Sequence, residues 1–366
     1  MNIIWFSWKD RNHPEAGGAE TVSGEIMDRL VLDGHTVQLI TSGYKNAKEH
    51  DFLNGVEVFR SGNRYSSYLK AYGVYKKMGS PRVDVVIDEM NTLPFAAGLY
   101  ARADKKVLLT YQLAREVWFY QMLFPLSVIG YLLEPIMLRI INCLYQKVLT
   151  ESESTKKDLK KYSFKDIHTF RVGMETKPLE ILPEKIALKT VLSLGAVRPM
   201  KRTLHAIKAF EYARDADSTL KMIVAGDISS KYASKVLSYI QSSRHSASID
   251  VKGRVTIKEK MDLMKESGII LVTSIKEGWG LIITEANSQG TPAIAYDADG
   301  LRDSIRANET GVLSPAGNPK LLGEEINKLL SDNSRYNLLR KNAWNSSKDF
   351  TFENSYADFL KQINNS

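Results

Sequence analysis

Residues 269–286 have the sequence IILVTSIKEGWGLIITEA. The first five are apolar or β-branched, which is typical of a strand buried on both faces. Gly278 and Gly280 mark a turn, and the residues that follow predict a helix. Glycines let a backbone approach a ligand, and the free amides at a helix start suit a phosphate. This strand–turn–helix segment therefore predicts a ligand site in an α/β fold.

The same alternation extends along the chain. Prolines at 178 and 183 interrupt it and indicate a linker. The pattern predicts an α/β protein of two tandem doubly wound, Rossmann-like domains with parallel sheets. Ligands of such sheets bind at the carboxyl ends of the strands, so we expect an interdomain cleft to hold the site. The predicted strands are residues 2–7, 36–41, 56–60, 83–88, 106–110, 147–150, 190–194, 220–225, 248–252, 269–273 and 293–296, and the clearest predicted helices are 19–33 and 152–162.

The expected domains are residues 1–178 and residues 179–349. Residues 350–366 are expected to form a helix that packs back on the first domain. A length of 366 residues suits two domains, each large enough to bury its own core.

Composition narrows the class of protein. Fifty basic and 42 acidic residues give a net charge of +8, partly from lysine pairs at 156–157 and 160–161. Such runs indicate either a solvated helix face or attraction to anionic substrates or an acidic membrane surface. No nucleic-acid-binding motif accompanies the charge, so no nucleic-acid partner is expected. Cys143 is the one cysteine, which excludes an intramolecular disulfide and favours a reducing, cytoplasmic location.

Residues 122–133 are the most apolar stretch. Pro125 breaks it, and it is shorter than the ~20 residues that a spanning helix needs. We expect that it does not cross a membrane. It packs in a core, or it belongs to a helix pair that presents leucines and aromatic side chains to lipid.

Two glutamates stand out beside the glycine turn. Glu277 is on the predicted loop and Glu285, eight positions later, is in the first turns of the predicted helix. Helical side chains lean toward the N-terminus, so the Glu285 carboxylate can point back to the turn and accept from paired sugar hydroxyls. A dinucleotide fingerprint is an alternative, but Ile283 occupies its third glycine position. A purely structural turn is the other alternative.

Two further segments carry suitable chemistry. Gly17 and Gly18 form a second glycine-rich turn between a strand and a helix. Residues 195–202, GAVRPMKR, follow the first strand of the second half and bring Arg198, Lys201 and Arg202 to a strand end. Several basic side chains there suit a diphosphate leaving group.

This combination resembles a known family. The GGAE segment at 17–20, Arg198 with Lys201, and Glu277 with Glu285 are similar to the retaining glycosyltransferases of family 4, which have the two-domain GT-B architecture. The resemblance covers nearly the whole chain and continues through residues 290–292, 300–303 and 311.

The resemblance implies roles for the matching residues. Glu277 would contact hydroxyls of the transferred sugar, and Lys201 with Arg198 would hold the diphosphate. Glu285 would bind the ribose of a nucleotide-sugar. The other implied donor-binding residues are Gly17, Gly18, Gly278, Gly280, Leu281 and, near the base, Val255.

On the acceptor side, residues 110–118 resemble a stretch in which relatives often place a histidine, where this chain has Tyr111. A tyrosine donates a hydrogen bond but is a poor base near neutral pH. Arg115 and Glu116 belong to the same stretch. A second departure is Ala196, at a position where many relatives carry an arginine.

The implied reaction retains configuration at the anomeric carbon and transfers sugar to a saccharide or lipid-linked acceptor. The lipid-facing interpretation of residues 122–133, with the nearby lysine-rich helix, predicts peripheral contact at the inner face of the cell membrane. The leaving diphosphate can take the acceptor's proton on the same face, so no enzyme nucleophile and no cofactor are needed. Asp-x-Asp occurs at 215–217 and 297–299, in neither case in a suitable context, and the six histidines show no ligand spacing, so no metal is expected. A nucleotide-sugar epimerase and a catalytically silent nucleotide-sugar-binding subunit are the rival interpretations.

Overall fold

The computed structural model describes residues 1–365, which form two compact units. The first unit comprises Met1–Gly173 and the segment that begins at Phe352, and the second is Met174–Thr351. The sequence places these boundaries at 178/179 and 349/350. In the structure the units divide at 173/174 and 351/352. Residues 174–178 contact the second unit: Gln289 Nε2 donates to the Lys177 carbonyl at 2.9 Å, and Thr176 Oγ1 donates to Glu285 Oε1 at 3.5 Å.

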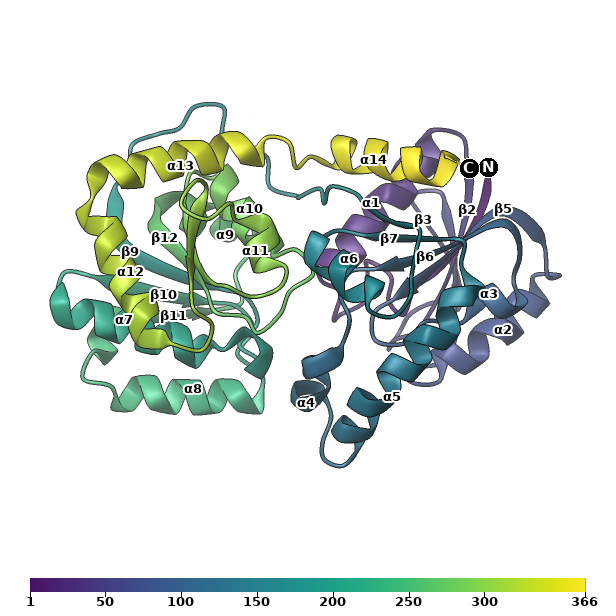
Figure 1. The fold of residues 1–366 in the computed structure, drawn as a ribbon, viewed down its shortest axis with the longest axis horizontal. Helices are drawn as coiled ribbons and strands as arrows, with labels where there is room; N and C mark the ends of the chain where they lie inside the picture. The colour runs from purple at the N-terminus through teal and green to yellow at the C-terminus, as the bar shows by residue number, and fades with distance from the viewer. Residues whose placement is uncertain (366) are drawn as a thin grey trace. The chain divides into compact units, whose positions relative to one another are not determined.

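The first unit contains an eight-stranded sheet of order β3-β4-β2-β1-β5-β6-β7-β8 (Figure 1). All pairings are parallel except β3–β4. The sequence missed β3 and β8 because both are short and lack an apolar run. The strands are β1 Asn2–Phe6, β2 Thr36–Thr41, β3 His50–Leu53, β4 Val56–Arg60, β5 Arg82–Met90, β6 Arg102–Thr110, β7 Lys147–Thr150 and β8 Ile167–Thr169.

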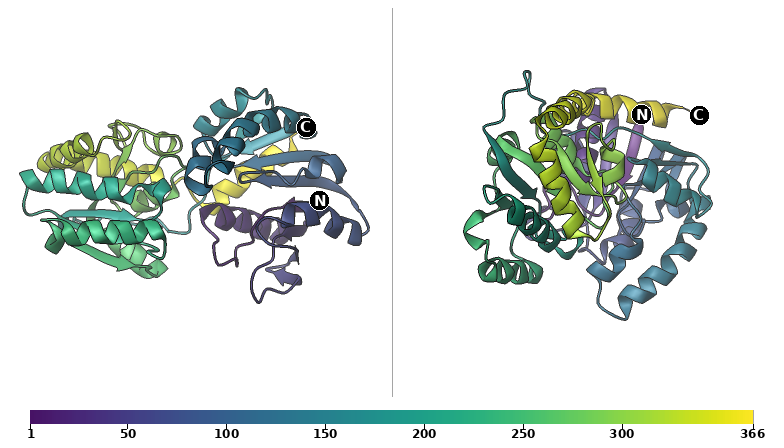
Figure 2. Two further views of the ribbon diagram at one scale, coloured as in Figure 1. Left: turned by 90° about the horizontal axis from the view of Figure 1, so that it is seen from below. Right: turned by 60° about the vertical axis from the view of Figure 1, so that its left-hand side comes forward.

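Helices cover both faces of this sheet, as Figure 2 shows in the view from below. Helix α14 packs on α1, and its Phe359 ring stacks on the buried Trp5 ring at 5.6 Å between centroids. The C-terminal helix is thus part of the first unit. The helices are α1 Gly18–Leu32, α2 Ser67–Lys77, α3 Ala97–Tyr100, α4 Trp118–Gln121, α5 Leu126–Ile141, α6 Glu153–Lys160 and α14 Phe352–Asn364.

The second unit has a six-stranded, all-parallel sheet of order β11-β10-β9-β12-β13-β14. Along β12, Ile269 and Leu271 enter one apolar cluster and Ile270 and Val272 enter another, so both faces of the sheet are buried. Only β14 lacks a counterpart among the predicted strands. The strands are β9 Ala187–Leu194, β10 Lys221–Ala225, β11 Ile249–Gly253, β12 Ser267–Val272, β13 Ala293–Tyr296 and β14 Gly311–Ser314; the helices are α7 Thr203–Ala216, α8 Lys231–Ser242, α9 Ile257–Glu266, α10 Leu281–Ser288, α11 Leu301–Ser304, α12 Pro319–Ser331 and α13 Asn333–Ser347.

Both sheets are doubly wound, which confirms the predicted fold class. In each, the strand order reverses beside the first strand: between β1 and β5 in the first unit, and between β9 and β12 in the second. Loops that leave the carboxyl ends of such neighbours diverge, and this is where open α/β sheets bind ligands.

The apolar segment of the first unit is longer than predicted. Helix α5 continues through Pro135 to Ile141, and a 3₁₀ turn extends it to Leu144. Residues 126–144 are long and apolar enough to cross a membrane by length and composition alone, and 22% of the stretch is buried in the structure. The apolar stretch 122–133 stops at Glu134, but Glu134, Pro135 and Arg139 interrupt the apolar run without interrupting the helix.

Candidate functional site

The second sheet brings two predicted segments together at its reversal point. The basic segment 195–202 follows β9, and the glycine-rich turn follows β12. Thr273 Oγ1 donates to the carbonyls of Lys201 at 2.8 Å and Arg202 at 3.0 Å, and the Ile275 amide donates to the Met200 carbonyl at 2.9 Å. The two loops are therefore held as one structure.

Lys201 and Glu277 form an ion pair across these loops, with Nζ donating to Oε1. Their side chains are 38% and 19% exposed, so the pair is accessible to a ligand. An exposed pair of this kind contributes little to stability. Each side chain of the pair can therefore exchange its partner for a polar or charged group of a ligand.

A close backbone approach sets the position of Glu277. Its amide donates to the Asp299 carbonyl at 3.0 Å, and a Cβ on Gly300 would lie 2.2 Å from the Glu277 carbonyl oxygen. Gly300 also has a φ of +79°, which an L side chain rarely adopts. Glycine at 300 therefore fixes the path of the loop that carries Glu277.

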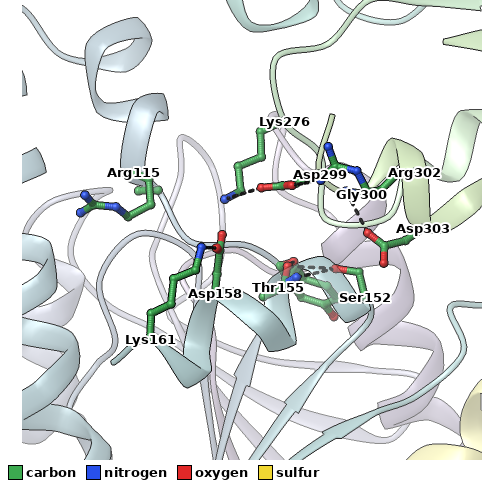
Figure 3. A network of polar contacts seen from close by, with 12 residues as sticks. Arg115, Ser152, Thr155, Asp158, Lys161, Lys276, Asp299, Gly300, Arg302 and Asp303 are labelled. Atoms are coloured by element: carbon green, nitrogen blue, oxygen red, sulfur yellow. Dashed lines mark hydrogen bonds and ion pairs between the residues drawn. The ribbon is translucent and has the colours of Figure 1, made fainter. Parts of the chain in front are cut away.

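Charged side chains lie around Gly300, as Figure 3 shows. Arg302 Nη1 donates to Asp299 Oδ1 at 2.5 Å, and Lys276 Nζ lies 3.4 Å from Asp299 Oδ2. Asp303 Oδ2 accepts from the Gly300 amide at 3.1 Å. The sequence alone does not indicate the contact between Lys276 and Asp299, because the two residues belong to separate loops, one after β12 and one after β13.

Glu285 forms a second pair, with Lys260. The Glu285 side chain lies on α10, where the residue is 7% exposed, and Lys260 Nζ of α9 donates to its Oε1 at 2.6 Å. Thr176 Oγ1 donates to the same oxygen at 3.5 Å. Burial raises the pKa of Glu285 above its usual range, while Lys260 acts in the opposite direction. Nothing in the spacing of the sequence indicates Lys260, because its partner is 25 residues away on another helix.

The glycine turn ends at the start of α10. Gly280 is the N-cap with a φ of +90°, and Leu281 is the first helical residue. The first amides of a helix have no partner within it, so they and the helix dipole favour an anion there. Gly278 lies on the same turn.

Two other predicted residues of the second unit follow the ends of β9 and β11. Arg198 is exposed at the cap of the 3₁₀ turn Pro199–Lys201, and its carbonyl accepts from the Lys201 amide at 3.0 Å. Val255 is half-buried against the apolar cluster beneath β12 and follows the carboxyl end of β11.

In the first unit, Gly17 is the N-cap of α1, which follows β1 at the reversal point of that sheet. The Gly17 amide donates to Glu20 Oε2 at 2.7 Å, and Glu20 pairs with Lys9 at 3.1 Å. The turn at Gly17 and Gly18 is thus held by a carboxylate of its own helix.

Tyr111 lies inside the first unit. Its hydroxyl is 2.6 Å from Ser23 Oγ and donates to the Ala19 carbonyl at 3.3 Å, and burial raises its pKa well above the usual value. Ser23 Oγ also donates to Glu89 Oε2 at 2.8 Å. Sequence reasoning did not identify Glu89, a carboxylate that β5 places beneath α1.

The structure separates Arg115 and Glu116 from Tyr111. The Arg115 amide donates to Glu134 Oε2 at 2.7 Å, and the guanidinium lies 4.2 Å from the Tyr131 ring centroid. Glu116 is exposed. Within residues 1–365, no cluster of three or more His, Cys, Asp or Glu side chains is arranged to hold a metal ion.

Two doubly wound sheets, with charged or glycine-rich loops at their reversal points, define the class of two-domain α/β proteins that bind nucleotide-like ligands. The family model described as Glycosyltransferase Family 4 matches residues 16–177, and the model described as Glycosyl transferases group 1 matches residues 180–346. The chain therefore belongs to the glycosyltransferases that these two models describe together.

Individual relatives are distant. D-inositol 3-phosphate glycosyltransferase of Rhodococcus jostii is 27% identical over 179 residues, which are 47% of this chain and 39% of that protein. The chain spans less than half the length of the curated relatives it matches. Among solved structures, sucrose-phosphate synthase of Thermosynechococcus elongatus has a TM-score of 0.78 at 16% identity, covering 99% of this chain and 98% of that one. Anabaena HepE in complex with UDP and glucose has a TM-score of 0.72 at 15% identity, covering 99% of both chains. These structures share the fold.

Proposed function

We propose that this chain is a retaining, metal-independent glycosyltransferase that moves a sugar from a nucleoside-diphosphate donor to a saccharide or lipid-linked acceptor. The observation that carries the proposal is the Lys201–Glu277 pair at the reversal point of the second sheet. It places a cation for phosphate and a carboxylate for hydroxyls on two loops that are tied together. Family membership supports the same reaction class and does not favour the epimerase or the silent subunit.

The proposed donor chemistry uses the second unit. Lys201, Arg198 and the first amides of α10, at Gly280 and Leu281, balance the negative charge that grows on the diphosphate as the glycosidic bond to it breaks. Glu277 accepts from hydroxyls of the transferred sugar. Lys201 then exchanges part of its contact with Glu277 for contact with the diphosphate, which leaves Glu277 free to accept from the sugar.

Glu285 is the proposed ribose ligand. A carboxylate accepts from two neighbouring hydroxyls, and Lys260 opposes the effect of burial on its protonation. Gly278 and Val255 complete the proposed donor contacts of this unit. In the first unit, Gly17 and Gly18 are proposed to approach phosphate.

The acceptor is proposed to be recognised by the first unit, through residues near Arg115 and Glu116. The leaving diphosphate takes the proton of the acceptor hydroxyl on the face from which it departs. No enzyme nucleophile, cofactor or metal is then required. We propose a cytoplasmic enzyme with peripheral contact at the inner face of the membrane.

The test is a thermal-shift panel of the purified chain against UDP, GDP and ADP and their sugar conjugates, repeated in EDTA. UDP is the first choice because Anabaena HepE holds it. A nucleotide at a hundred times its dissociation constant should stabilise the chain by about 2.7 kcal/mol. A shift with one base, followed by mass-spectrometric detection of a glycoside with unchanged anomeric configuration, is expected. Folded protein that responds to none of them would contradict the proposal, and an epimerised donor would favour the rival reaction.

A further inference from the structure

Helices α4 and α5 form a hairpin on the first unit (Figure 1). Several of its large apolar side chains are exposed. The loop between them ends in Leu123 and Phe124, which are 86% and 82% exposed. We define the α5 ridge as Leu123, Phe124, Leu126, Leu132, Ile136 and Ile140, all more than half exposed. Single exposed apolar side chains are normal on proteins, but a contiguous row of this kind marks a surface that is covered in use.

The opposite side of α5 is fixed to the unit. Leu138 and Ile141 are buried in an apolar cluster with Leu159 of α6. The Glu134 carboxylate accepts from the Ala114 amide at 2.8 Å and from Trp118 Nε1 at 2.9 Å, in addition to the Arg115 amide. Helix α5 could cross a membrane only by leaving these partners.

Basic side chains border the ridge. Arg139 is exposed on α5, and its guanidinium lies 5.6 Å from the Tyr162 ring just beyond α6. Lys157 and Lys160 are exposed on α6. Three acidic groups on α6 and the segment after it have cationic or histidine partners: Asp158 pairs with Lys161 at 2.7 Å (Figure 3), Glu153 with Lys156 at 3.6 Å, and Asp166 with His168 at 2.6 Å. Glu116, just before α4, is exposed. Arg139, Lys157 and Lys160 outnumber it, so the exposed charge of α5 and α6 is positive on balance.

We propose that the α4–α5 hairpin docks the first unit on an anionic phospholipid membrane. Leu123, Phe124 and Leu126 enter the acyl region, and Arg139, Lys157 and Lys160 meet the headgroups. The helix lies against the membrane and does not span it. This inference rests on the proposed function and narrows its acceptor to the lipid-linked class, which is presented at such a surface.

Charge favours lipid over a second copy of the chain. A two-fold contact through the ridge would bring two sets of Arg139, Lys157 and Lys160 near one another, and like charges repel. The protruding Leu123–Phe124 tip suits a fluid acyl layer, which needs no matching pocket. An anionic membrane offers both an apolar layer and negative charge.

The test is co-sedimentation of the full chain with sucrose-loaded vesicles, either of phosphatidylcholine alone or with phosphatidylglycerol. We expect binding to the anionic vesicles and much weaker binding to the neutral ones. Leu123→Ser/Phe124→Ser should reduce binding by at least about tenfold, because two large apolar side chains no longer leave water. Lys157→Gln/Lys160→Gln should reduce binding to anionic vesicles by about fivefold for each lysine.

Matched controls lie on the second unit. Leu338→Ser removes a leucine of α13 that is 60% exposed, and Lys231→Gln/Lys235→Gln makes the same charge change on α8. Both should bind vesicles like the wild type. Equal binding of the tip variant and the wild type, no binding of the wild type, or a dimer in light scattering that the tip variant dissolves would overturn the inference.

The nucleotide thermal shift, measured on the same variants, separates this inference from the proposed function. If nucleotide raises the melting temperature but the chain does not bind vesicles, only the proposed docking surface is contradicted. If the chain binds vesicles but no nucleotide, the proposed transferase function is contradicted and the docking surface is supported.

Discussion

Glu89 makes the stability of the first unit depend on pH. The carboxyl group is completely buried beneath α1, and its Oε2 accepts from Trp5 Nε1 at 3.0 Å and Ser23 Oγ at 2.8 Å. Burial raises its pKa from 4.5 to about 7. Between those values the folded chain holds a proton that the unfolded chain has lost, so the free energy of unfolding falls as the pH rises through this window. A shift of about 2.5 units corresponds to a loss of about 3 kcal/mol at full ionisation.

Glu89→Gln tests this directly, since glutamine keeps the shape and an acceptor oxygen but cannot ionise. Urea unfolding at about pH 5 and about pH 8 should show the wild type losing about 2.5 kcal/mol relative to the variant. For a domain of this size the loss corresponds to roughly 5–10 °C in melting temperature. Asp104→Asn, at an exposed carboxylate of β6, is the control and should keep the wild-type pH dependence. Parallel pH profiles for the wild type and Glu89→Gln would refute the reasoning.

Glu285→Gln should weaken nucleoside-diphosphate binding by at least about tenfold in calorimetry, because a charged acceptor for the ribose becomes neutral; unchanged affinity would remove it from the site. Lys201→Ala should lower kcat more than it raises KM if the lysine stabilises charge that develops on the diphosphate, and a change in KM alone would mean ground-state binding. Gly300→Ala should lower activity in steady-state assays, since its Cβ would lie 2.2 Å from the Glu277 carbonyl, and wild-type turnover would contradict that constraint. Tyr111→Phe should lower the melting temperature through the lost Ser23 contact while keeping activity, and a selective loss of turnover would return the hydroxyl to the mechanism.

Most of the fold could be predicted because both sheets are largely buried and parallel, apart from the antiparallel edge pair β3–β4. Their central strands are continuous apolar runs bounded by turns, a pattern that needs no long-range information. The missed strands lie at sheet edges. β3 has the sequence HDFL, and its alternating exposure leaves no apolar run to detect.

The length of α5 was missed for a different reason. Glu134 reads as a polar break, yet its carboxylate is buried on backbone amides of a segment 20 residues earlier. Only tertiary structure supplies such partners. Pro135 has no amide to donate to the Tyr131 carbonyl four residues earlier, and Arg115 Nη1 donates to that carbonyl at 3.1 Å.

The residues of the candidate site likewise include some that the sequence predicts and some that depend on tertiary structure. Glu277, Lys201 and Gly280 follow strands directly, so topology alone places them at the reversal point of the sheet. Lys260 could not be found in the sequence, because its contact with Glu285 depends on how α9 packs beside α10. Tyr111 is on the expected segment, but whether its hydroxyl points outward or under α1 is a matter of side-chain direction that spacing does not contain.

The charges of the second unit show why the lysines matter to more than binding. Lys201, Lys260 and Lys276 each have a carboxylate partner in Glu277, Glu285 and Asp299. In the proposed reaction, a nucleotide-sugar therefore competes for charges that are already paired, and the affinity of the ground state gains only the difference between the old and new contacts. As the bond to the sugar breaks, the diphosphate gains negative charge while Glu277 gains none. The Lys201 ammonium is then attracted more strongly to the diphosphate than to Glu277. Its contact with the diphosphate, which adds little free energy when the donor binds, therefore stabilises the transition state.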